Sequence, residues 1–176
     1  MMIIREARIE DVITIANLHT ESWRNTYRTV LTKDYLKDIV PNERKNIWEN
    51  RLKFPKDNQY ILVAESNEDI VGFACVFIDE NTEWGSYLEN LHINKDFQSK
   101  GIGKSLLLKI AQLCNKKASS KSMCLLVNQD NINAQNFYLH VGANNVQVGI
   151  WHAPDGSEVP TYWFVWNSLD ALIKKS

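Results

Sequence analysis

The amino-acid sequence predicts a mixed α/β fold that is rich in β-strand. Three observations support this prediction. Apolar stripes with helical spacing alternate along the chain with short β-rich runs, and turn-forming residues separate these runs. In addition, the segment NLHINKDFQSKGIGKSLLLKI at 90–110 has the pattern of a strand, a loop and a helix in succession. Such alternation is typical of a domain in which helices cover a central sheet.

The N-terminal part is expected to begin with a short strand and a helix. Asp11 offers a helix cap, and the residues after it recur at helical spacing: Val12, Ile15, Ala16 and His19. Two further helices are expected around 33–40 and 42–52, separated at Pro41. The runs QYILVAES and DIVGFACVFID then indicate two strands, joined by the turn-forming segment Asn-Glu-Asp at 67–69.

The C-terminal part continues the alternation. SYLENLHI is a weakly alternating strand, and the stripe of Ile102, Leu106 and Ile110 predicts a helix after Gly101. MCLLVNQ is a short apolar strand. NINAQNFYLHV is expected to form a helix that stops at Gly142. VQVGIWH and TYWFVWN are predicted as the last two strands, on either side of a Pro-Asp-Gly turn at 154–156.

Length and composition limit the possible functions. A chain of 176 residues suggests one domain over 1–176, and 20 basic against 21 acidic residues leave no electrostatic footprint for nucleic acid or a membrane surface. We see no signal peptide and no apolar run long enough to cross a membrane, so a cytoplasmic location is expected. The three cysteines lie outside any C-x-x-C pair and are expected to be small buried residues, without a metal site: Cys75, Cys114 and Cys124.

The loop between Gln98 and Lys104 has the sequence of an anion site, because unpaired amides at a helix N-terminus attract phosphate. Two phosphate-binding motifs fail here. A Walker A loop requires glycine at 98, where this chain has Gln98, and the dinucleotide fingerprint requires glycine at 106, where it has Leu106. An ordinary strand-to-helix turn remains the alternative.

A third pattern fits the loop. Gln98-x-x-Gly101-x-Gly103 resembles the pyrophosphate-binding loop of the GNAT N-acetyltransferase superfamily. About thirty residues later, NINAQNFYLHVGA is similar to a second motif of that family, at Asn131, Ala134, Phe137, Tyr138, Gly142 and Ala143. The resemblance implies one acetyltransferase domain over 1–176. Its fold would be a mixed, mostly antiparallel central sheet with a splayed parallel strand pair, flanked by helices.

The resemblance also implies acetyl-coenzyme A as co-substrate, without a metal. Backbone groups of the preceding strand would hold the pantetheine arm and the thioester carbonyl, and the loop would hold the diphosphate. The positions implied in coenzyme binding are Leu91, His92, Ile93, Gln98, Ser99, Lys100, Gly101, Ile102, Gly103, Lys104, Asn131, Ala134 and Tyr138. Asn131 either contacts the coenzyme or caps its helix.

Two residues are candidates for catalysis. Tyr138 matches the position that protonates the departing thiolate, and the alternative is a tyrosine that packs in the core. Glu89 is a candidate base, since strand alternation would place it on one face with Tyr87, Leu91 and Ile93. A solvated or ion-paired carboxylate is the alternative for Glu89. In the family that the chain resembles, the acidic position is more often two residues earlier, where this chain carries Tyr87. Deprotonation through a water molecule by Glu89 or Tyr87 is therefore an equal alternative to a direct carboxylate base. Alternation places His92 on the opposite face, in a structural role.

The acceptor site is expected to begin near the end of the first helix, where Trp23 and Tyr27 would form an aromatic wall, with Tyr87 on the strand. Core packing is the alternative for the wall. The implied activity is direct acetyl transfer to a primary amine of a small molecule or peptide, by a protein that could form a homodimer. The rival is a non-catalytic acyl-coenzyme A sensor on the same fold.

Overall fold

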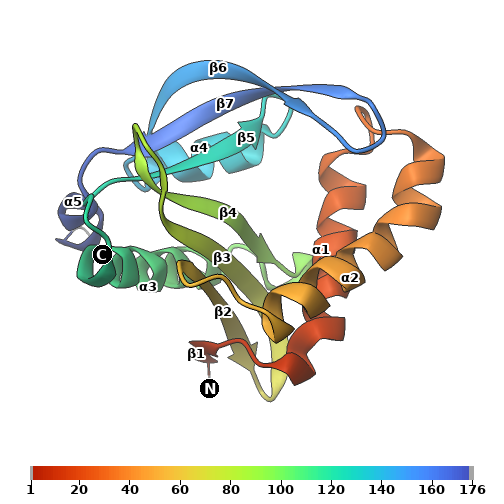
Figure 1. Ribbon diagram of the computed structural model, residues 1–176, viewed down its shortest axis with the longest axis horizontal. Helices are drawn as coiled ribbons and strands as arrows, with labels where there is room; N and C mark the ends of the chain where they lie inside the picture. Colours follow the sequence, from red (N-terminus) through yellow and green to blue (C-terminus); the bar gives the residue numbers. More distant parts are fainter. Residues whose placement is uncertain (1, 175–176) are drawn as a thin grey trace.

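The computed structural model describes residues 2–174, which form one seven-stranded sheet flanked by helices (Figure 1). Across the sheet the strand order is β1-β2-β3-β4-β5-β7-β6. The strands are β1 (Met2–Glu6), β2 (Gln59–Ser66), β3 (Asp69–Asn81), β4 (Gly85–Ile93), β5 (Met123–Asn128), β6 (Asn144–His152) and β7 (Glu158–Trp166). Every neighbouring pair is antiparallel except β4 and β5, as the sequence predicted.

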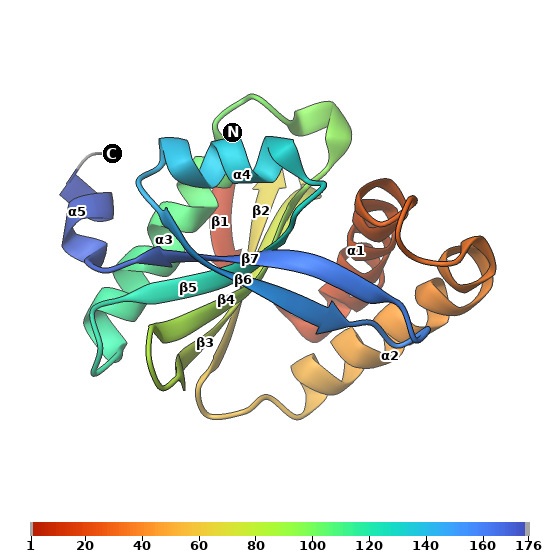
Figure 2. The same ribbon diagram turned by 90° about the horizontal axis from the view of Figure 1, so that it is seen from above.

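Helices cover both faces of the sheet (Figure 2). One face carries α1 (Val12–Thr26) and α2 (Val40–Lys53), and the other carries α3 (Ile102–Lys117) and α4 (Ile132–His140). A C-terminal helix, α5 (Leu169–Lys174), packs against α3 and had no counterpart in the expected elements. Three short helical turns complete the chain: η1 (Ile9–Asp11), η2 (Tyr35–Ile39) and η3 (Lys95–Phe97).

The two faces of the sheet bury two separate apolar clusters. On the α1/α2 face, Ile15 and Trp48 pack against Phe73 of β3 with no exposed surface. On the α3/α4 face, Leu106 and Ile110 pack against strands β3, β4 and β5. Side chains of β3 alternate between these clusters, as expected for a strand buried on both faces.

Two expectations about the N-terminal helices were wrong. Pro41 does not separate two helices, because α2 begins at Val40 and Pro41 lies in its first turn. Backbone N–H groups in the first turn of a helix have no acceptor within the helix, so proline is tolerated there. Asp11 is the residue before α1, but its side chain does not cap that helix. Its carboxylate instead pairs with Arg5, at 2.7 Å, and accepts a hydrogen bond from the Arg8 amide.

The three cysteines are buried and free, as expected. No helix within residues 2–174 is long and apolar enough to cross a membrane.

Candidate active site

The loop before α3 presents a run of unpaired amides. The Ser105 amide is the first to be bonded in α3, to the Gly101 carbonyl at 3.0 Å, and within residues 2–174 the amides of 99–104 have no hydrogen-bond acceptor. Ser99 and Gly101 both have positive φ, at 61° and 79°. A turn of this kind directs successive N–H groups to one concave side, where they attract an anion together with the helix dipole.

Two side chains hold this loop in place. The Gln98 amide donates to the Ile93 carbonyl at 3.2 Å, which ties the loop to the end of β4. Lys100 bends back over the Phe97 ring and donates to the Asp96 carbonyl, whereas Lys104 is exposed. Gly103 lies against Ile93 and the Phe137 ring of α4. The loop, β4 and α4 therefore meet at one place.

β4 and β5 diverge beside this loop. Within residues 2–174 the two parallel strands pair only at Ser86–Met123 and Tyr87–Cys124. From there β4 stays paired with β3, and β5 pairs with β7 (Figure 1). The β5-side edge of β4 over 88–93, which includes Leu91, His92 and Ile93, therefore has no strand partner, and its backbone groups on that side are available to a ligand.

A β-bulge in β4 overturns the expected alternation. Asn90 pairs with Cys75 and Leu88 pairs with Val76, so Glu89 is the extra residue. Directly paired residues carry their side chains on one face. Tyr87, Asn90 and His92 therefore face α1 and α2, because their partners Phe77, Cys75 and Phe73 do so.

Of the residues expected to share a face with Glu89, Tyr87 lines the same hollow, whereas Leu91 and Ile93 lie on the other face of the sheet. Leu91 and Ile93 pack instead in the cluster beneath α3 and α4. The expectation that His92 lies on the opposite face from Glu89 was wrong: Glu89 pairs with Arg51 of α2 and His92 contacts Ser22 of α1, because the extra residue reverses the pleat beyond it.

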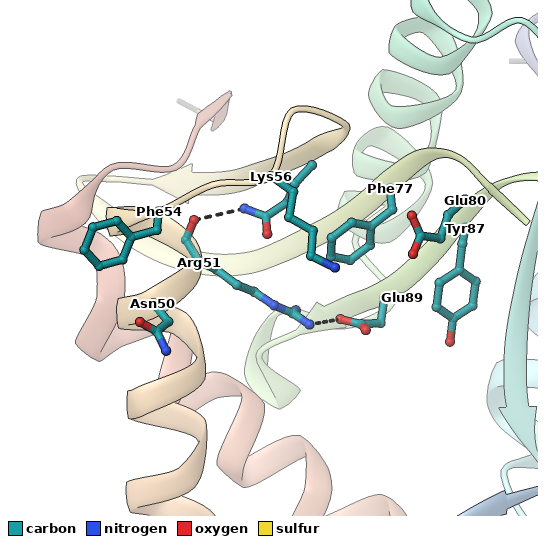
Figure 3. A pocket seen from close by; sticks show the side chains of 9 residues that line it. Asn50, Arg51, Phe54, Lys56, Phe77, Glu80, Tyr87 and Glu89 are labelled. Carbon is teal, nitrogen blue, oxygen red and sulfur yellow. Dashed lines mark hydrogen bonds and ion pairs between the residues drawn. The ribbon is translucent and has the colours of Figure 1, made fainter.

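Glu89 lies on the wall of a shallow hollow of about 320 Å³ between the end of α2 and strands β2, β3 and β4 (Figure 3). Its carboxylate forms an ion pair with Arg51 at 2.5 Å, and Arg51 also donates to Asn90 at 3.3 Å. Tyr87 lines the same hollow, where burial raises the pKa of its phenol well above the ordinary value. Glu89 is thus a paired carboxylate at the rim of a pocket.

His92 is half-buried and lies beside the buried His19. Its ring lies 5.0 Å from that of His19 in α1, and its Nδ1 lies 2.6 Å from the Ser22 hydroxyl. Burial, together with the positive charge of Arg44, lowers the pKa of His92 to about 4. Burial also lowers the pKa of His19, whose Nδ1 accepts a hydrogen bond from the Trp48 indole at 2.9 Å. Both rings are therefore neutral at pH 7.

Tyr138 in α4 is 8% exposed and packs beside the rings of Phe137, Phe164 and Trp166. Burial raises its pKa well above 10. Within residues 2–174 no group forms a hydrogen bond with its hydroxyl. The ring thus belongs to the core, and the hydroxyl remains available to a ligand.

Asn131 caps α4, since its side-chain oxygen accepts the Ala134 amide at 3.1 Å. This is one of the two roles expected for it. Ala134 is half-buried and packs against the apolar cluster on the α3/α4 side of the sheet. The cap at Asn131 fixes the start of α4, the helix that carries Tyr138.

Trp23 and Tyr27 do contact each other, with ring centroids 5.2 Å apart. Trp23 is buried, with the Arg44 guanidinium 4.1 Å from its ring centroid. Trp151 of β6 contacts both rings and joins the β6–β7 hairpin to α1. The pair therefore contributes to packing, and the Tyr87 ring lies against Trp163, with centroids 6.0 Å apart.

The sequence did not reveal which side chains of α1 and α2 contact Glu89 and His92. Arg51 and Arg44 come from α2, and Ser22 and His19 come from α1. They meet β4 only in the folded chain, from positions up to about seventy residues distant. His19 was recognised only as part of the helical stripe. No local motif marks the others.

A splayed parallel pair next to an amide-rich loop leaves an opening whose free backbone groups suit an anionic, extended ligand. The sequence profile of the Acetyltransferase (GNAT) family matches residues 14–143, well over half of the chain. The chain belongs to this family.

Similar proteins include N-acetyltransferases. An uncharacterised N-acetyltransferase of Bacillus subtilis, YuaI, is 27% identical over 133 residues, 74% of each chain. A spermidine N(1)-acetyltransferase of Thermoplasma acidophilum is 25% identical over 138 residues, 77% of this chain and 84% of the relative.

Solved structures share the fold. The PaiA N-acetyltransferase of Thermoplasma acidophilum in complex with coenzyme A has a TM-score of 0.70 at 22% identity, with 92% of this chain and 98% of that chain covered. The protein YncA of Salmonella typhimurium, with its cofactor acetyl-CoA, has a TM-score of 0.68 at 17% identity, with 94% and 93% covered.

Proposed function

We propose that this protein transfers the acetyl group of acetyl-coenzyme A directly to a primary amine. The observation that carries the proposal is the opening between β4 and β5, with the unpaired amides of 99–104 beside it. These amides suit a diphosphate, and the unpaired β4 edge suits the amide-rich pantetheine arm. The structures of relatives with coenzyme A and acetyl-CoA support the same ligand.

Backbone amides, the loop and Tyr138 would each contribute to one part of the transfer. Backbone amides of 91–93 would hold the thioester and stabilise its carbonyl oxygen as charge develops. The remote coenzyme handle, held by Gln98 to Lys104, would fix the position of the reacting end. Tyr138, protonated at neutral pH because burial raises its pKa, would give its proton to the departing thiolate.

The acceptor would approach from the α1/α2 face, because the hollow beside Tyr87 and Glu89 opens at the end of α2. That side offers Tyr87 and the hollow lined by Glu80 and Glu89, together with Arg51 and Lys56. The relative named as a spermidine N(1)-acetyltransferase supports a primary amine of a small molecule as the first acceptor to test. A non-catalytic acyl-coenzyme A sensor is the rival function, and the unpartnered Tyr138 hydroxyl argues for the enzyme.

The test is an acetyl-transfer assay with purified protein, acetyl-coenzyme A and a panel of primary amines that includes spermidine, amino acids and a short peptide with a free N-terminus. Release of coenzyme A is followed with a thiol reagent, and the acetylated product is identified by mass. We expect amine-dependent release with at least one member. Binding of coenzyme A without turnover on any amine would instead support the sensor.

A further inference from the structure

The Ser22–His92 pair lies on the acceptor side of the splayed strands. The bulge at Glu89 turns the His92 side chain toward α1, while its backbone belongs to the unpaired edge of β4. The ring is held on two sides, by His19 at 5.0 Å and by Phe73 at 5.2 Å between centroids. His92 is half-buried. The ring is therefore fixed in position, and the residue keeps part of its surface exposed.

The hydrogen bonding of the ring leaves one nitrogen free. Ser22 Oγ lies 2.6 Å from Nδ1, and within residues 2–174 Nε2 has no hydrogen-bond partner. If the hydroxyl accepts the Nδ1–H, the neutral ring keeps its lone pair on Nε2. The groups near the ring are Ser22 and His19 from α1, Arg44 from α2 and Phe73 from β3. None of them carries a negative charge that would favour an imidazolium.

We propose that Nε2 of His92 takes the proton from the amine nitrogen during acetyl transfer, with Ser22 as the positioning residue that fixes the ring. This inference rests on the proposed function and names the proton acceptor of that reaction. Glu89 is the competing candidate, since it lines the hollow beside Tyr87, but Arg51 already neutralises its carboxylate.

The proposed transfer forms one C–N bond, breaks one C–S bond and conserves protons. The acceptor, which has lost one proton to solvent, attacks the thioester carbon through its nitrogen lone pair, so that the C–N bond forms and the nitrogen becomes positive. This nitrogen is then far more acidic than the free ammonium, which is why a weak neutral base suffices. Its proton passes to His92 as the C–S bond breaks, and the thiolate takes a proton from Tyr138. Solvent afterwards returns the His92 proton to the Tyr138 phenolate.

The kinetic test uses the full chain, acetyl-coenzyme A and the amine with the highest turnover in the panel. His92→Gln keeps a side chain that can bond Ser22 but cannot accept a proton at neutral pH. We expect kcat to fall at least about 100-fold, with the Kd for coenzyme A within about threefold of the wild type. Ser22→Ala should reduce kcat by about tenfold, and Glu89→Gln should cost less than His92→Gln.

An independent readout is the ring tautomer, measured by 15N–1H NMR in the protein without an acceptor. We expect the proton on Nδ1 of His92, and a change of tautomer population in Ser22→Ala. A purely structural histidine would not combine this tautomer with an unchanged Kd and a lost kcat.

The results that would reject His92 differ from the result that would reject the proposed function. A proton fixed on Nε2, a His92→Gln enzyme within about threefold of wild-type kcat, or a larger loss in Glu89→Gln would each reject His92 as the acceptor. If the wild-type protein acetylates no amine, the proposed function itself fails, and this inference fails with it.

Discussion

Gly101→Asp is expected to weaken coenzyme A binding by at least about 100-fold. No heavy atom lies within 4 Å of a Cβ built at Gly101, so the new side chain would extend into the open space beside the unpaired amides. Two unit charges 4 Å apart repel by about 4 kcal/mol at an effective dielectric constant of 20, and a 100-fold loss requires only about 2.8 kcal/mol. Isothermal titration with coenzyme A measures the change.

Backbone strain must be separated from charge in this variant. Gly101 has φ of 79°, where most side chains cost about 1–2 kcal/mol and asparagine is tolerated better. Gly101→Asn is therefore the matched control: it has nearly the shape of aspartate without its charge. We expect it to retain much more affinity than Gly101→Asp. Equal losses in both variants would mean that conformation, and not a bound diphosphate, explains the effect.

Tyr138→Phe is expected to lower kcat by about 100-fold to 10,000-fold with little change in coenzyme A affinity. The ring keeps its contacts with Phe164 and Trp166. The deleted hydroxyl leaves no other group unpaired within residues 2–174. Steady-state kinetics with a panel amine gives kcat, and thermal unfolding, expected within about 0.5 kcal/mol of the wild type, serves as the folding control.

The raised pKa of Tyr138 is compatible with this role. A phenol well above pKa 10 is a poor donor to an ordinary thiolate, whose pKa is about 8.5. Burial raises thiol pKa values as well: in this protein it raises those of Cys75 and Cys124 to about 12. A thiolate that departs beside Tyr138 would meet the same low-polarity surroundings, so the two pKa values approach each other. Wild-type kcat in Tyr138→Phe would exclude the acid role.

Local patterns predicted the fold well. The helical stripe after Gly101 became α3, the apolar run MCLLVNQ became β5, and the loop lies between β4 and α3 as the Gln98-x-x-Gly101-x-Gly103 pattern requires. These features depend on side-chain periodicity and on glycine, which act over a few residues. The helix boundary predicted at Pro41 was wrong because proline is common both between helices and in the first turn of a helix, and the local sequence does not distinguish the two cases.

The candidate site was predicted only in part. The bulge at Glu89 contains no glycine that would indicate it in the sequence. One extra residue is enough to place the side chains of Leu91 and His92 on the faces opposite to those that regular alternation predicts. The pairing of Glu89 with Arg51, and of His92 with Ser22, depends on how α1 and α2 pack on the sheet. Such contacts arise from tertiary packing, which the spacing of residues along the chain does not encode.

The most direct measurement for the central claim is thermal unfolding of the purified protein alone and with acetyl-coenzyme A, coenzyme A, ATP or NAD in excess. A ligand at about 100 times its Kd adds about 2.7 kcal/mol of stability, which corresponds to a rise of roughly 5–10 °C for a chain of 176 residues. We expect both coenzyme A species to raise Tm, with little effect of ATP or NAD and a much smaller rise in Gly101→Asp. No rise with coenzyme A, or a rise with ATP alone, would contradict the proposed binding of coenzyme A between β4 and β5.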